Sequence, residues 1–115
     1  MPPRDLLLFH YTDKSGFQAI KAQVDWIFKT ADPPGKHPHG AYFTTLDPRI
    51  RNLANRLRIP RSKVEYVFCF RDSQDLIPLA GGRGLFILYS PQDYLVERLR
   101  QVFSGPSKDF LEDVR

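Results

Sequence analysis

His10 is the residue whose chemistry and position in the sequence most clearly point to a function. An unbroken apolar run, Leu6 to Phe9, leads directly into His10, and Asp13-Lys14-Ser15-Gly16 then begins a helix. A short apolar run of this kind predicts a strand that is buried on both faces. The imidazole would therefore lie at the rim of a sheet, where binding and catalytic groups tend to gather. The alternative is a histidine that only packs in the core or caps a helix.

The other reactive residue types argue against metal and thiol chemistry. Cys69 is the single cysteine, so the sequence excludes an intrachain disulfide and metal sites built from several cysteines. It stands inside an apolar run, and we expect a buried, unreactive thiol. His37 and His39 lie in a proline-rich loop without the spacing of a helical metal pair, and two ligands fall short of a tetrahedral site. The sequence offers no evident covalent nucleophile, and we expect no metal.

The basic residues are concentrated in one segment. The chain has 17 Lys and Arg against 13 Asp and Glu, and a net charge of +4. Between positions 49 and 63 six residues are basic and none is acidic: Arg49, Arg51, Arg56, Arg58, Arg61 and Lys63. Such a segment is typical of phosphate-backbone binding, and its alternative is a solvated helix face.

Size and hydropathy predict one domain, spanning residues 1–115, that does not enter a membrane. A chain of 115 residues is long enough for one core without metal or disulfide support. No apolar stretch approaches the length of a membrane span, and the first residues do not resemble a secretory signal. We therefore expect it to act in the cytoplasm.

The apolar periodicity predicts an α+β domain with six or seven strands and two helices, both in the N-terminal half. The first helix follows Asp13 and ends near Ala22; the second begins at Asp47-Pro48, carries the apolar stripe Ile50, Leu53, Ala54 and Leu57, and ends before Pro60. Residues 93–103 fit a strand, with a helix as the alternative. The strands are expected at residues 6–12, 24–28, 40–45, 64–70, 76–79, 85–89 and 93–103. The strand at 64–70 should be central, and Pro78 confines the strand at 76–79 to an edge.

Three segments of these strands together resemble a known family. They are His10-Tyr11-Thr12, Gly40-Ala41-Tyr42-Phe43 and Asp93-Tyr94-Leu95-Val96. In order, spacing and strand context they are similar to the ADP-ribosyltransferases with a His-Tyr-Asp signature. These occur among polymorphic toxin domains and are related to diphtheria toxin and the poly(ADP-ribose) polymerases. The resemblance covers residues 6–102 and implies split antiparallel sheets around an NAD cleft, with NAD as co-substrate and no metal.

The resemblance also implies a role for each matching residue. His10 would hydrogen-bond the adenosine ribose, Tyr42 would stack on the nicotinamide, and Asp93 would hydrogen-bond the nicotinamide ribose. Where many relatives have glycine after the histidine, this chain has Tyr11, whose backbone remains available to the nicotinamide amide. Glu97 is the alternative carboxylate. The residues expected to contact NAD are His10, Tyr11, Thr12, Tyr42 and Thr44.

These roles suit the chemistry of breaking the N-glycosidic bond of NAD. Positive charge develops on the ribose, and a fixed carboxylate stabilises it. The implied activity is mono-ADP-ribosylation of a protein or nucleic acid, with glycohydrolysis as a side reaction and an immunity protein as a partner if the domain is a toxin. The alternatives are a basic nucleic-acid-binding module and a domain that binds NAD or ADP-ribose without transfer. Among single residues, Tyr42 could be a core tyrosine and Asp93 a turn residue.

Overall fold

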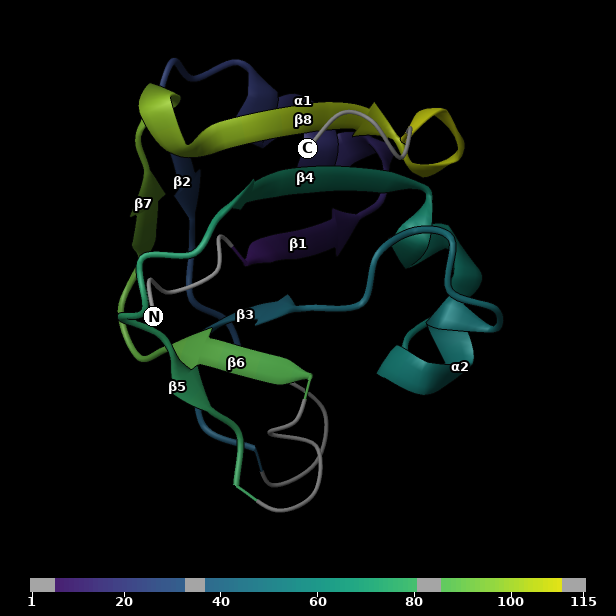
Figure 1. The fold of residues 1–115 in the computed structure, drawn as a ribbon, viewed down its shortest axis with the longest axis horizontal. Coiled ribbons are helices and arrows are strands. Elements are labelled where there is room, and N and C mark those ends of the chain that lie inside the picture. Colours follow the sequence, from purple (N-terminus) through teal and green to yellow (C-terminus); the bar gives the residue numbers. More distant parts are fainter. Residues whose placement is uncertain (1–5, 33–36, 81–85, 111–115) are drawn as a thin grey trace.

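The chain is organised around two long, adjacent strands, β1 (Leu7–Thr12) and β4 (Tyr66–Arg71), in a computed structural model that describes residues 6–32, 37–80 and 86–110. They lie inside a six-stranded antiparallel sheet with the order β5-β6-β3-β1-β4-β8 (Figure 1). The other strands of this sheet are β3 (Ala41–Thr44), β5 (Ile77–Pro78), β6 (Ile87–Ser90) and β8 (Gln101–Pro106). A second, two-stranded sheet pairs β2 (Trp26–Phe28) with β7 (Tyr94–Val96). The α+β prediction is confirmed at this level.

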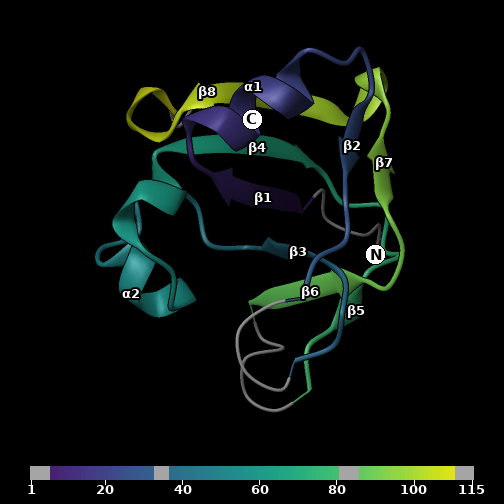
Figure 2. The ribbon, with the colours of Figure 1, turned by 180° about the vertical axis from the view of Figure 1, so that it is seen from behind.

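Both faces of the large sheet are apolar and covered. One face, which we call the α1 face, carries Leu8, Phe43, Phe68 and Phe70 beneath α1 (Lys14–Lys21) and the β2–β7 pair. The opposite α2 face carries Phe9, Val67 and Cys69 beneath α2 (Leu53–Leu57) and Phe110. Figure 2, the view from behind, shows α1 and β2 on the near side of the sheet. Alternation along β4 supplies both clusters, which confirms the predictions that it is central and that β1 is buried on both faces.

The first helix forms where the sequence predicts it. Asp13 is its N-cap: the carboxylate accepts a hydrogen bond from the Gly16 N–H at 2.9 Å, and the helix ends at Lys21. Phe17 is its buried residue and stacks on Tyr66 of β4. The helix thereby packs against the α1 face of the sheet directly after the end of β1, close to His10 in sequence.

The second helix is shorter than predicted, and its expected start at Asp47-Pro48 is wrong. The Asp47 carboxylate accepts a hydrogen bond from the Arg49 N–H at 2.8 Å and also binds the Arg49 guanidinium, which closes a turn instead of a helix. Asn52 then adopts a left-handed conformation, so α2 begins only at Leu53. Of the predicted stripe, Leu53 is the residue that is buried.

Several strand boundaries also differ from the predictions. Val64 belongs to a 3-10 helix, η1 (Arg61–Val64), so β4 begins at Tyr66. Val24 is exposed and β2 begins at Trp26. The segment 93–103 forms β7, a 3-10 turn η3 (Arg98–Arg100) and the start of β8, which confirms strand over helix apart from that turn. Another 3-10 turn, η4 (Ser107–Asp109), follows β8. Strand β5 lies at the edge of the sheet, as predicted from Pro78.

Candidate functional site

His10 sits on the α1 face and is held by aromatic rings. Its ring centroid lies 4.6 Å from that of Phe28 on β2 and 5.7 Å from that of Phe43 on β3. Desolvation in this setting lowers the pKa of the imidazole to about 4, so the ring is neutral at neutral pH. Part of the residue nevertheless remains exposed to solvent.

One hydrogen bond fixes which nitrogen of His10 carries the proton. Nδ1 lies 3.1 Å from the backbone carbonyl oxygen of Tyr42. A carbonyl only accepts, so in the neutral ring Nδ1 is the donor and Nε2 keeps a lone pair. The imidazole is thus oriented with an acceptor on its far side, which suits a hydroxyl donor such as a ribose.

This hydrogen bond lies where β1 and β3 stop pairing. A single register pair, Phe9 with Thr44, joins these two strands, whereas six pairs join β1 to β4. Beyond Phe9 the His10 side chain, not its backbone, reaches across to β3. The structure thereby brings together the segments of His10 and Tyr42, which are 32 residues apart in sequence. They meet at a local opening, where the backbone pairing of β1 with β3 stops.

The side chain of Tyr42 points to the opposite face from the imidazole. Its neighbours Ala41 and Phe43 belong to the α1-face cluster, so alternation places Tyr42 on the α2 face. There its ring stacks on Tyr89 of β6, with centroids 5.4 Å apart and planes inclined by 19°, and its hydroxyl donates to the carbonyl of Pro38 at 2.5 Å. Partial burial raises the pKa of this hydroxyl. Tyr42 is therefore an aromatic platform with one face already covered by Tyr89.

Asp93 is exposed, and its carboxylate is engaged with the backbone. It precedes β7, and its Oδ1 accepts a hydrogen bond from the Thr30 N–H at 2.9 Å. The next residue, Tyr94, packs on Phe43 with ring centroids 5.2 Å apart, so the Asp93 segment adjoins the other two. Glu97, the alternative carboxylate, is exposed at the far end of β7. The three segments meet, but the imidazole, the phenol and the carboxylate point in different directions.

The remaining predicted NAD contacts have buried side chains. The Tyr11 hydroxyl donates to the carbonyl of Leu46 at 2.7 Å, and Thr44 Oγ1 donates to the carbonyl of Phe86 at 2.6 Å. Burial raises the pKa of Tyr11 far above its usual value. Thr12 is also buried, at the end of β1. The contact with NAD that is expected of Tyr11 is made by its backbone, and the hydrogen bond of its side chain does not involve those backbone atoms.

Sequence reasoning missed a hydrogen-bonded cluster beneath β7. The Tyr94 hydroxyl donates to Asp75 Oδ1 at 2.5 Å and accepts from Arg100 Nη2 at 2.8 Å, and Ser73 donates to the same carboxylate oxygen at 2.7 Å. Burial and the Asp75 carboxylate raise the pKa of Tyr94. These residues come from three separate segments with no spacing signal in the sequence. These hydrogen bonds connect Tyr94 of β7 to residues next to the large sheet. They thereby stabilise the position of the β2–β7 pair, whose Phe28 packs on His10.

The histidine-rich loop does not extend this site. His39 Nδ1 lies 2.7 Å from an Asp32 carboxylate oxygen, and both residues are exposed. Among the described residues no group of three or more metal-ligating side chains occurs. No helix in the described part of the chain is long and apolar enough to cross a membrane.

Searches of family models, curated proteins and solved structures returned no match to this chain. The functional argument therefore depends on the residues and on their geometry.

Proposed function

We propose that this protein is an NAD-dependent ADP-ribosyltransferase that uses the opening between β1 and β3. The observation that supports this most is the hydrogen bond from His10 to the backbone of Tyr42, because it joins two of the three signature segments at one point. A neutral imidazole with a free Nε2 suits a ribose hydroxyl. The split-sheet architecture implied by the resemblance is part of this proposal.

In the proposed reaction the bond between nicotinamide and ribose C1′ breaks. Nicotinamide leaves with the bonding electron pair, and positive charge develops on the ribose ring. The Asp93 carboxylate hydrogen-bonds this ribose and stabilises the charge. The acceptor then attacks C1′ and loses a proton; when the acceptor is water, the outcome is glycohydrolysis.

The proposal requires the site to rearrange when NAD binds. Asp93 has to exchange the Thr30 N–H for a ribose hydroxyl, and Tyr42 has to present a ring face to nicotinamide. A hydrogen bond to a charged group contributes about 1.5–3 kcal/mol in general, and an exposed one less. Contacts to the dinucleotide must offset this cost.

Nicotinamide release from NAD tests the proposal, with Asp93→Asn as the decisive variant. Asn keeps an Oδ1 acceptor for the Thr30 N–H, so the local fold is retained while the charge is lost. We expect release to fall by two or more orders of magnitude, in line with the loss of an electrostatic group.

Glu97→Gln is the matched control, because it removes one negative charge at the other end of β7. It should leave release unchanged. Loss of activity in Glu97→Gln but not in Asp93→Asn would instead make Glu97 the functional carboxylate. No nicotinamide release by the unmodified protein, with a range of protein and nucleic-acid acceptors present, would contradict the proposed function.

A further inference from the structure

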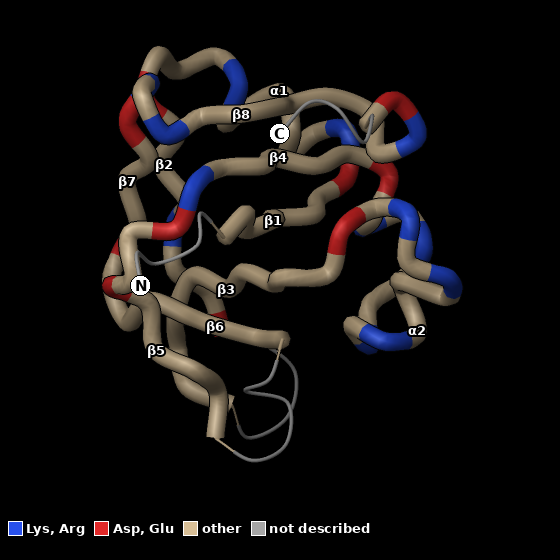
Figure 3. The backbone as a smooth tube through the Cα atoms, in the orientation of Figure 1, with Lys and Arg blue, Asp and Glu red and all other residues tan. Residues whose placement is uncertain are grey.

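Three arginines of the basic segment are exposed and have no acidic partner among the residues that the structure describes. At the ends of the segment, Arg49 pairs with Asp47 at 3.0 Å and Lys63 pairs with Asp13 at 2.8 Å. Between them, three exposed arginines form no ion pair with the described residues. These are Arg51, Arg58 and Arg61, which we call the basic corner. Figure 3 shows Lys and Arg gathered around α2 and the turn that leads away from it.

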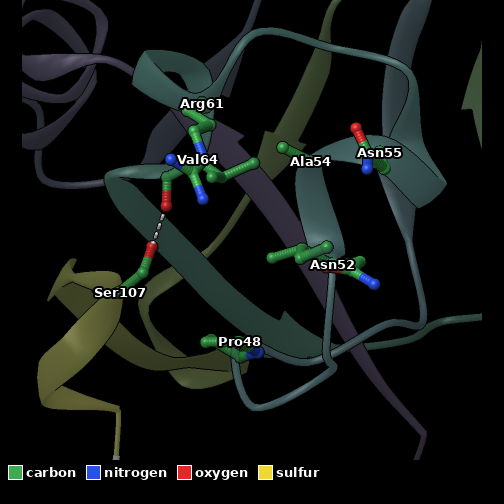
Figure 4. Close-up of a pocket in the computed structure, with 8 residues that line it drawn as sticks. Pro48, Asn52, Ala54, Asn55, Arg61, Val64 and Ser107 are labelled. Atoms are coloured by element: carbon green, nitrogen blue, oxygen red, sulfur yellow. Dashed lines mark hydrogen bonds between the residues drawn. The ribbon is translucent and has the colours of Figure 1, made fainter.

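An open pocket of about 270 Å³ lies beside Arg61, one arginine of the basic corner. Arg61 lines the pocket together with two exposed amides, Asn52 and Asn55, and with Ser107. Figure 4 shows α2 on one side of this space and Arg61, Val64 and Ser107 on the other. Guanidinium and amide N–H groups are donors of the kind that bind phosphate oxygens. The pocket therefore has hydrogen-bond donors in its lining, and none of the described residues that line it is acidic.

The backbone at Arg58 is in a conformation that normally selects glycine. Arg58 ends α2 with φ 60° and ψ 43°, in the left-handed region, and its N–H caps carbonyls of the helix. Glycine adopts this conformation without a steric cost, whereas an L side chain does not. An arginine in this place is unfavourable for the local fold, which is consistent with a use for its charge.

We propose that the basic corner binds the phosphate backbone of a nucleic acid without reading its bases. No aromatic residue occurs between positions 47 and 65, and none is among the described residues that line the pocket, so these residues offer no ring on which bases could stack. Protein interfaces and membrane-bound surfaces depend on apolar or aromatic side chains at their centres. Among the described residues, the large apolar side chains that are exposed lie elsewhere, at Leu6, Val24, Ile77, Leu95 and Leu99. The corner contains no residue of the proposed NAD site, so this inference stands independently of the proposed function.

Binding of labelled RNA and DNA oligonucleotides of mixed sequence, followed by fluorescence anisotropy without NAD, tests the inference. Three arginines that each neutralise one phosphate give a slope of about −2.7 for log K against log salt on duplex DNA. Affinity should therefore fall about 40-fold between 50 and 200 mM salt. Sequence and base composition should have little effect.

Charge-removing variants locate the surface. Arg51→Gln, Arg61→Gln and Arg58→Gly should each weaken binding several-fold and reduce the salt slope by about 1. Arg58→Gly is the sharpest of the three, because glycine suits the left-handed position and the variant should be at least as stable as the parent. Arg98→Gln, in η3 at the end of β7, makes the same change in net charge and should leave binding unaltered.

Three results would overturn the inference. The first is no binding at 50 mM salt. The second is an equal loss in Arg98→Gln, which would reduce the effect to net charge. The third is binding of polyglutamate or anionic lipid vesicles, with the same variant pattern, as tightly as RNA or DNA.

Discussion

The protonation state of His10 follows from its surroundings. Aromatic rings replace water around the imidazole, and among the described residues the carbonyl of Tyr42 is its hydrogen-bond partner. A backbone carbonyl raises the pKa of the ring, but desolvation outweighs it, and the net result is a pKa of about 4. At neutral pH His10 therefore serves as an oriented hydrogen-bonding group and not as a charge.

This lowered pKa predicts a pH dependence of stability. Below the ordinary pKa of 6.5, His10 binds a proton in the unfolded chain, whereas in the folded chain it stays neutral down to about pH 4. The free energy of unfolding should therefore fall as the pH drops from 6.5 to 4, by at most about 3 kcal/mol from this residue. Urea unfolding at several pH values should show a steeper loss in the parent than in His10→Gln. Parallel curves for the two proteins would contradict the assignment.

The sequence points to the position of His10 but not to the directions of its partners. An apolar run that ends in histidine is a local signal, so the strand and the helix after it could be predicted. The face of the sheet on which Tyr42 lies depends on its register against β6, and the hydrogen bond from the Thr30 N–H to Asp93 joins residues 63 apart in sequence. Such long-range geometry has no short-range signature. The alternatives to a functional role each describe part of the structure. His10 packs among core aromatic rings, and the Asp93 carboxylate accepts a hydrogen bond from the backbone.

At the scale of elements, Gly40 explains why the tyrosine segment begins with glycine. It is buried, and a Cβ on this residue would lie 2.6 Å from the backbone oxygen of Ser90 at the end of β6. Glycine therefore permits the close approach of β3 and β6 that stacks Tyr42 on Tyr89. The need is steric, and the sequence alone does not distinguish it from an ordinary turn glycine.

We expect Gly40→Ala to destabilise the protein by about 1–3 kcal/mol, because a backbone strand has to move to admit the methyl group. Gly16→Ala is the comparison: there the added Cβ meets side-chain atoms of Thr12 and Asp13 and not the backbone of a neighbouring strand. Thermal unfolding of both variants measures the difference. An equal or smaller loss in Gly40→Ala would show that β3 and β6 are not held as closely as described.

The two helices show what local patterns can and cannot predict. The first is capped by Asp13 and has its predicted bounds, because its signals are local and do not compete. The second has an equally good start in Asp47-Pro48, but the guanidinium of Arg49 and the same carboxylate stabilise a turn instead. A side-chain contact of this kind competes with helix formation, and periodicity does not report it.

At the scale of the whole molecule, the large sheet separates two surfaces with different proposed tasks. The α1 face, closed by the β2–β7 pair, holds the imidazole, and the basic corner lies around α2 on the opposite side (Figures 1 and 3). The central strands β1 and β4 are common to both faces. Local opening near His10 could therefore occur without disturbing the basic corner.

The reactivity of Cys69 measures how readily the central strands β1 and β4 open. Cys69 is fully buried in β4 on the α2 face, and burial raises the pKa of its thiol to about 12. We expect a thiol reagent to label the native protein at least about 1000-fold more slowly than the unfolded chain, with labelling only through unfolding. The control is the same reaction in denaturant. Rapid labelling under native conditions would mean that the centre of the sheet opens readily.

The most direct measurement of the central claim is a titration with NAD followed by NMR signals of the His10 imidazole and the Tyr42 ring. If NAD binds where β1 and β3 part, both sets of signals shift together and saturate with one dissociation constant. The Tyr89 ring, stacked on Tyr42, shifts with them. Signals of His10 and Tyr42 that stay unchanged at millimolar NAD would contradict the account.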